Sequence, residues 1–354
     1  MDGKDYLCID DRELARLETV YAGYRRLHDD PQNCRPMIVI NTPVTLPTWE
    51  ARLADPLVML RAELDLIRPH LAIGDDRVPS VRVQFGTAQV AAAFGCEMFL
   101  PENNLPAAGN HVLANAEDVY QLAMPDLTAG WYGKLAEWTA LWQEQLPAGV
   151  HMQHPDIQSA FNSAQLIRGN DIFTDFYDRP EAVDALLDRV TDFMLAITRH
   201  TKAQISRDPD WFFDWGAMWK GSARISNCSM QMISPQLYGE HVLPRDIRFF
   251  DRIGGGRMHY CGRSLDIVDE FFKVPAITGL DVDCEFHDFF ALCDHMPERV
   301  VLMPTIPLES SSPVLQRLLR GEWPKKRNIV IFASAPSIAD GQTLFNQLSH
   351  AMPN

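Results

Sequence analysis

Short apolar strand patterns alternate with helical patterns throughout the C-terminal part of the chain. The strand patterns cover 257–261, 276–281, 300–303 and 328–333, and the helical patterns cover 264–272, 287–296, 313–320 and 340–350. A strand, a helix and a second strand in succession place the two strands parallel, joined by a right-handed crossover. This alternation constrains the fold more than any other feature, and it predicts an α/β protein with parallel strands covered by helices.

The N-terminal half continues the same alternation with longer helices. Its strand patterns cover 37–40, 80–83, 149–153 and 223–227, and amphipathic patterns cover 11–28, 49–70, 131–144 and 180–202. Eight strands, each followed by a helix, fit a (β/α)₈ TIM barrel with additional N-terminal helices. The alternative is a doubly wound open sheet, but its glycine-rich turn after the first strand is missing at 38–43. We therefore expect one barrel domain over 1–354, with 1–75 as a helical extension packed on it.

The charge balance limits the partners. The chain has 32 Lys and Arg against 47 Asp and Glu, a formal net charge of −15. That excess disfavours nucleic acids and anionic membrane surfaces, which bind through basic faces. The chain begins without the basic start and apolar run of a secretory signal, and its seven cysteines are an odd number. We expect a cytoplasmic protein with reduced thiols and a small-molecule substrate; a homodimer is compatible with the sequence.

The sharpest local motif is His259-Tyr260-Cys261 at the end of a predicted strand. Residues i and i+2 of a strand point to the same side, so His259 and Cys261 are expected to project together into the barrel mouth, where the strands end. A neutral imidazole and a thiolate suit Zn²⁺. A buried histidine beside an inert cysteine is the alternative interpretation. Further ligands or bases are expected at other strand ends, namely Asp281, Asp283, Cys284, Glu285 and Ser334.

Several other residues are candidate substrate contacts. Arginines in or near predicted strands can bind a carboxylate through two hydrogen bonds, although solvated surface arginines are the alternative. The aromatic segment 211–219 can either wall a flat ligand or fill the core. The candidates are Arg82, Arg168, Arg224, Arg257, Arg263, Trp215 and Tyr260.

Four segments also occur in a recognisable order. They are 85–97, 166–169 with 176–181, the Ser-Pro-Gln-Leu-Tyr stretch 234–238 running to the Leu-Pro at 243–244, and 259–262. Together they resemble the uroporphyrinogen decarboxylase superfamily, in particular its zinc- and corrinoid-dependent methyltransferases. The resemblance implies a (β/α)₈ barrel with its site at the mouth. It also implies zinc held by the His-x-Cys pair and a later cysteine, which activates a thiol as methyl acceptor.

One departure from that pattern concerns the later cysteine. It is expected at the end of the last strand, where this chain has Ser334. Cys284, Asp283 or Asp281 are the alternatives for the third ligand, and Asp281 and Asp283 are also the expected catalytic groups.

Three functions follow from the resemblance. The first is a zinc-dependent methyltransferase-like enzyme that moves a methyl group to or from a corrinoid or thiol, with a methylated corrinoid protein or a small methylated compound as donor. The second is a metal-independent decarboxylase of a porphyrinogen or related acid. That branch depends on an arginine-rich first-strand motif, and 33–40 contains only Arg35. The third is a barrel that binds a tetrapyrrole or corrinoid without catalysis.

Overall fold

The computed structural model describes residues 3–304 and 308–353, in which parallel strands form a barrel. Around its axis the strands follow chain order: β1 (Met37–Asn41), β2 (Ser80–Val81), β5 (His151–Met152) continued by β6 (Ile157–Gln158), β9 (Ala223–Ser226), β10 (Gly256–Tyr260), β11 (Ile277–Val282), β12 (Val301–Pro304) and β13 (Val330–Ser334). The last strand returns to the first, with Met37 opposite Val330 and Asn41 opposite Ser334. The predicted (β/α)₈ barrel is confirmed.

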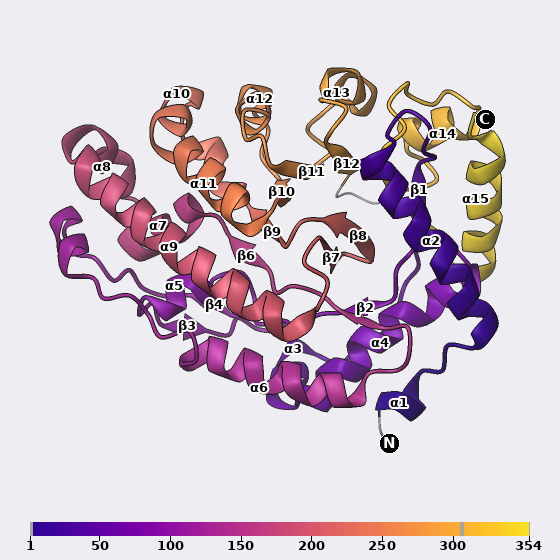
Figure 1. The fold of residues 1–354 in the computed structure, drawn as a ribbon, viewed down its shortest axis with the longest axis horizontal. Helices are drawn as coiled ribbons and strands as arrows, with labels where there is room; N and C mark the ends of the chain where they lie inside the picture. The colour runs from indigo at the N-terminus through magenta and orange to yellow at the C-terminus, as the bar shows by residue number, and fades with distance from the viewer. Residues whose placement is uncertain (1–2, 305–307, 354) are drawn as a thin grey trace.

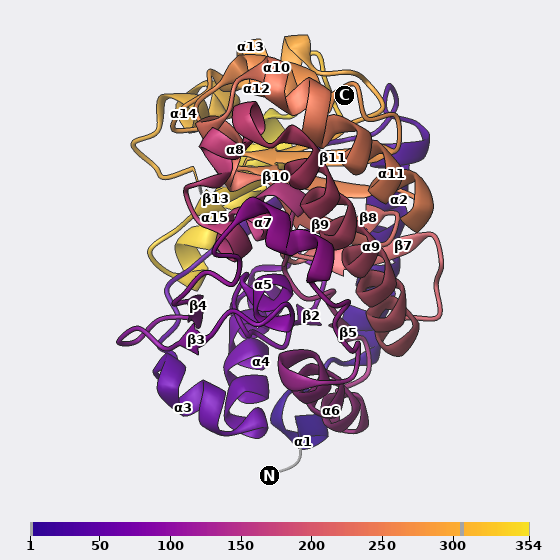
Figure 2. The same cartoon turned by 90° about the vertical axis from the view of Figure 1, so that its left-hand side faces the viewer.

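Helices surround these strands, as Figures 1 and 2 show. They are α1 (Gly3–Tyr6), α2 (Asp11–Asp29), α3 (Trp49–Ala54), α4 (Pro56–Ile73), α5 (Gln89–Ala93), α6 (Gly130–Gln145), α7 (Ala160–Arg168), α8 (Ile172–Asp178), α9 (Pro180–Ile205), α10 (Pro235–Leu237), α11 (Leu243–Ile253), α12 (Leu265–Phe271), α13 (Phe289–His295), α14 (Pro313–Leu319) and α15 (Ile338–Ala351). Helix α15 packs against β1 and α4, so the last helix of the chain lies beside the first barrel strand (Figure 1). None of the described helices combines the length and apolarity needed to cross a membrane.

Two details differ from the sequence-based expectation. The helix expected over 49–70 is divided at Asp55, whose carboxylate caps the first turn of α4, and Pro56 occupies the first position of that helix. The segment 1–75 is not helical throughout, because it contains the barrel strand β1.

A hairpin that the sequence did not predict fills part of the barrel interior, against β1, β12 and β13. Strands β7 (Trp211–Asp214) and β8 (Ala217–Lys220) pair antiparallel immediately before β9 and lie near the centre of the molecule (Figure 1). Trp219 is buried among inward-facing residues that include Met37, Val39 and Val301. Gly279 on β11 leaves room for its indole, since a Cβ there would lie 2.6 Å from Trp219 Cζ3. The hairpin therefore forms an apolar floor beneath the mouth.

Strands β1 and β2 are connected differently from the other neighbours. One backbone hydrogen bond joins Asp76 N to Ile38 O, and the backbone amides of Ile38 and Ile40 donate to the carboxylates of Asp76 and Asp75. These carboxylates replace the ladder bonds that buried amides require. In this part of the barrel wall, side-chain carboxylates therefore take the place of backbone-to-backbone hydrogen bonds.

Candidate metal centre and active site

Three neighbouring strands place their inward-facing residues in two layers. His259 of β10 lies opposite Ser226 of β9 and Asp281 of β11. One layer below, Arg257 lies opposite Arg224 and Gly279. Because side chains two residues apart on a strand share a face, the ends of β9, β10 and β11 converge on one region of the mouth.

A possible metal site lies at these strand ends. One ligand atom from each of Cys228, His259 and Cys261 lies within 4.8 Å of the other two, and the three residues are partly buried. Cys228 lies two residues beyond the end of β9. The backbone N–H of Asn227, between them, donates to the carbonyl of His259 at 2.8 Å, which joins this turn to β10. One nitrogen and two sulfur ligands form a donor set that suits zinc, with a fourth position left for substrate.

The third member of this group was not predicted from the sequence. Asp281, Asp283 and Cys284 do not belong to it, and Ser334 ends β13 opposite Asn41 of β1. Cys228 is the first residue after the strand predicted at 223–227, so the rule that ligands stand at strand ends, applied to that strand as well, would have identified it.

Electrostatic interactions within the group favour a thiolate. A hydrogen bond from Cys228 and the neighbouring His259 outweigh burial and lower the pKa of Cys261 to about 5, while the pKa of Cys228 is raised. Burial and Arg224 oppose a proton on His259, but Asp281 and Cys261 outweigh them, so the pKa of His259 is raised. Thiolate character is what metal ligation by cysteine requires.

Asp281 supports the candidate metal-binding group through its contacts with His259 and two arginines. Its Oδ2 lies 2.5 Å from His259 Nδ1, which leaves Nε2 as the ligand nitrogen. Its Oδ1 lies 3.2 Å from Arg257 Nε and 3.6 Å from Arg224 Nε. Burial opposes ionisation, but Arg257, His259 and Arg224 hold the pKa of Asp281 well below its usual range. A carboxylate behind a ligating histidine fixes its tautomer and orientation.

The ion pairs continue across the barrel. Asp214, at the end of β7, pairs with Arg257, and its Oδ1 lies 3.0 Å from Arg82 Nη1. Arg224 Nη1 lies 2.6 Å from Asp156 Oδ1. The arginines Arg82, Arg224 and Arg257 are thus balanced by Asp156, Asp214 and Asp281, as charges removed from water require. Of the predicted arginines, Arg82, Arg224 and Arg257 therefore lie in the barrel interior.

Three predicted substrate contacts lie in other surroundings. Tyr260 is fully buried among apolar residues, and its hydroxyl accepts from the backbone N–H of Ser264, because its position on β10 faces the helices. Arg168 pairs with Asp171 and Asp175 at the end of α7. Arg263 is exposed, with its guanidinium 4.3 Å from the ring centre of Phe286. Each has a structural partner that accounts for it.

Two further predicted residues stand just beyond β11. Asp283 Oδ1 accepts from the backbone N–H of Glu285 at 2.9 Å, which stabilises the turn. Burial raises the pKa of Cys284 to about 12, so its thiol stays protonated at neutral pH. Within the described residues, neither interacts with the Cys228–His259–Cys261 group.

The Ser-Pro-Gln-Leu-Tyr motif supports the turn that carries Cys228. Ser234 caps α10, and the hydroxyl of Tyr238 donates to Asp246 Oδ2 at 2.8 Å. The same oxygen accepts from the Asn227 side chain at 3.3 Å. Burial raises the pKa of Asp246 to about 7, even though both hydrogen bonds oppose the shift. The motif therefore holds the residue next to Cys228 through buried polar contacts.

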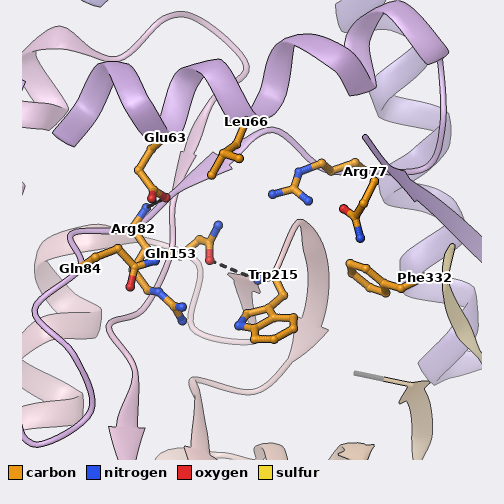
Figure 3. Close-up of a pocket in the computed structure, with 9 residues that line it drawn as sticks. Glu63, Leu66, Arg77, Arg82, Gln84, Gln153, Trp215 and Phe332 are labelled. Carbon is orange, nitrogen blue, oxygen red and sulfur yellow. Dashed lines mark hydrogen bonds between the residues drawn. The ribbon is translucent and has the colours of Figure 1, made fainter. Parts of the chain in front are cut away.

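A separate pocket opens beside β1 and β2 (Figure 3). Trp215, from the turn of the β7–β8 hairpin, forms one wall, and its backbone N–H donates to Gln153 Oε1 at 3.1 Å. The guanidinium of Arg224 lies 5.6 Å from the centre of the Trp215 ring. The sequence left open whether this aromatic segment is wall or core; Trp219 is core and Trp215 lines a pocket.

The barrel, with a Cys/His/Cys group at its mouth, defines the class of protein: a TIM-barrel protein with a possible metal centre. A sequence profile described as "Uroporphyrinogen decarboxylase (URO-D)" matches residues 67–303. The chain belongs to the uroporphyrinogen decarboxylase family, as its sequence motifs predicted.

Two individual proteins are also similar to this chain. A methylcobamide:CoM methyltransferase, MtbA, of Methanosarcina acetivorans is 27% identical over 226 residues, which cover 60% of this chain and 60% of that protein. The solved structure of a methyltransferase from Methanosarcina mazei superposes with a TM-score of 0.67 at 16% identity, covering 95% of this chain and 97% of the other. The first match spans about three fifths of its relative, and the second supports the fold.

Proposed function

We propose that the protein is a zinc-dependent methyltransferase that transfers a methyl group to or from a corrinoid or a thiol. The observation that carries the proposal is the convergence of Cys228, His259 and Cys261 at the barrel mouth. The similarity to a methylcobamide:CoM methyltransferase supports the choice of reaction.

The residues fit zinc by the chemistry of their donors. Cys261 has thiolate character and His259 presents Nε2, because its Nδ1 is engaged by Asp281. Zinc bound there supplies a Lewis acid that lowers the pKa of a coordinated thiol.

The surrounding charges define what the chain itself contributes. Asp281 holds His259 in one orientation, and Arg257 with Arg224 holds Asp281. This arrangement keeps the ligand set ordered before metal or substrate arrives, and such preorganisation reduces the cost of assembling a site. Asp281 is therefore proposed as a positioning residue rather than as an acid or base.

The test combines metal analysis with a methyl-transfer assay. We expect the purified protein to hold about one zinc per chain, in line with the single donor set described. His259→Ala and Cys228→Ser should remove it, while Cys8→Ser, at an exposed cysteine, should not. With zinc present, the loss of methylcobalamin absorbance should depend on an added thiol such as coenzyme M.

Two outcomes would contradict the proposal. One is a correctly folded wild-type protein that fails to bind zinc at micromolar concentrations. The other is zinc-loaded protein that demethylates methylcobalamin no faster than His259→Ala does. Release of CO₂ from a porphyrinogen by metal-free protein would support the decarboxylase alternative instead.

A further inference from the structure

The pocket beside β1 and β2 has a volume of about 220 Å³ and is lined by two arginines, Arg77 and Arg82. Figure 3 shows their guanidinium groups approaching the space from opposite sides, with Gln153 and Trp215 between them and Glu63 of α4 beside Arg82. None of the expectations drawn from the sequence included Arg77. Its surroundings differ from those of Arg82 in a way that points to a missing partner.

Within the described residues, Arg82 has an ion-pair partner and the side chain of Arg77 has none. Arg82 Nη1 lies 3.0 Å from Asp214 Oδ1. The guanidinium of Arg77 has no hydrogen bond or ion pair with another residue in the described parts of the chain, and its Nε is buried. A buried guanidinium nitrogen without a partner is costly, so an anion in the pocket would stabilise Arg77.

The two carboxylates that precede Arg77 in sequence are already engaged, and Asp76 pairs with Arg35. Asp75 Oδ2 accepts from the backbone N–H of Ile40 at 2.7 Å and lies 2.7 Å from His70 Nδ1. Its Oδ1 accepts from the backbone N–H of Arg77, at 3.1 Å, rather than from the side chain. The side-chain donors of Arg77 are therefore available to a ligand.

The hairpin turn that faces Arg77 adopts a costly backbone conformation. Trp215 has φ +51° and Gly216 has φ +69°. A bulky residue at positive φ is a strained exception, and such strain is concentrated at functional sites. A Cβ on Gly216 would lie 2.7 Å from Arg77 Cγ, so the glycine makes space for the arginine. The turn thus presents an aromatic ring to the pocket and packs against Arg77, which lines the same pocket.

We propose that this pocket binds the carboxylate of a compact, planar organic acid, with Arg77 as the cation and the Trp215 indole as the stacking surface. Arg77 offers paired N–H donors that match a carboxylate. Glu63 also lines the pocket and Arg82 is shared with Asp214, so one negative charge is favoured over several. That the acid is the substrate of methyl transfer rests on the proposed function; that the pocket binds it does not.

The experiment uses metal-free protein, so that it is independent of the zinc centre. Benzoate is titrated by calorimetry, with benzamide as the neutral analogue of the same shape. We expect benzoate to bind at least tenfold more tightly than benzamide, and Arg77→Met to lose at least tenfold in benzoate affinity. Arg77→Lys should fall between them. Arg25→Met, at an exposed position of α2, makes the same charge change and should bind like the wild type.

A second variant keeps the proposal falsifiable if Arg77→Met fails to fold. Glu63→Gln removes the competing carboxylate and should tighten benzoate binding several-fold. Equal affinity for benzoate and benzamide, or an Arg77→Met variant that folds and binds benzoate like the wild type, would overturn the proposal. Zinc measured in parallel separates the two proposals, since either ligand can be lost without the other.

Discussion

The barrel interior has two halves that are built by opposite means from different strands. The apolar half lies against β1 and β12: Met37, Val39 and Val301 pack around Trp219 of the hairpin. The ionic half lies at β9, β10 and β11, with Asp281 held between His259 and buried arginines. Buried apolar surface stabilises the fold directly, whereas buried charges at best offset the cost of losing water. Substitutions in the apolar half should therefore mainly change the stability of the fold. Substitutions in the ionic half should mainly change the binding of metal and ligand.

The largest effect is expected on the stability of the fold, at Trp219 in the floor of the barrel. Trp219→Ala removes a fully buried indole from the centre of the barrel, and we expect it to lower the free energy of unfolding by about 4 kcal/mol. Zinc stoichiometry of the remaining folded protein should be unchanged. Denaturant unfolding measures the loss, with Tyr177→Ala, at a residue 74% exposed, as the control. A loss below about 1 kcal/mol would mean that the hairpin is not the floor of the barrel.

The second largest effect is expected on zinc affinity, at Asp281. Asp281→Asn keeps the shape of the side chain but removes the charge that faces His259 and Arg257. We expect zinc affinity to fall by about 10- to 100-fold, as for other partners of ligating histidines. Competition with a chromophoric chelator measures it. Asp283→Asn, two residues further along, should leave the affinity unchanged, and equal losses in both variants would contradict the positioning role.

The stability of the apolar half should also depend on pH, through the buried His28. Burial, with Lys220 nearby, lowers the pKa of His28 to about 3. Because the unfolded state then binds more protons below about pH 6.5, stability should fall as the pH drops. Between pH 7.5 and 5.5 this one group accounts for about 1.4 kcal/mol.

A variant at His28 isolates the contribution of this histidine to the pH dependence of stability. His28→Phe should flatten the dependence of unfolding free energy on pH by the stated amount, since His28 sits between Trp211 and Trp219 in aromatic contact. His350→Gln, at an exposed histidine of α15, is the control. Identical slopes for His28→Phe and the wild type would mean that His28 takes up its proton without loss of stability.

The strand–helix alternation was enough to predict the barrel. Each predicted strand starts or ends within a few residues of an observed one, because strands such as β1 and β13 are buried at nearly every residue and are therefore short apolar runs in the sequence. The β7–β8 hairpin was not predicted because its aromatic residues fit a core or a ligand wall equally well. Only its position in the fold decides that Trp219 is buried and Trp215 lines the pocket.

The site could be predicted in part for a similar reason. His259 and Cys261 are two residues apart, so their convergence follows from strand geometry alone. Cys228 and Arg77 reach their sites through tertiary contacts: a backbone bond from Asn227 to His259 in one case and packing on Gly216 in the other. Sequence spacing carries no record of either contact.

The smallest expected effect concerns a cysteine that sequence spacing favoured. Cys284 follows β11 as Cys228 follows β9, yet only Cys228 belongs to the group with His259 and Cys261. Cys284→Ala should therefore change zinc affinity by less than twofold, whereas Cys228→Ala should abolish tight binding. Both variants remove one thiol, so a common effect on cysteine content or oxidation cannot explain a difference between them. Release of zinc by Cys284→Ala together with its retention by Cys228→Ala would contradict this assignment. The third ligand would then follow β11 rather than β9.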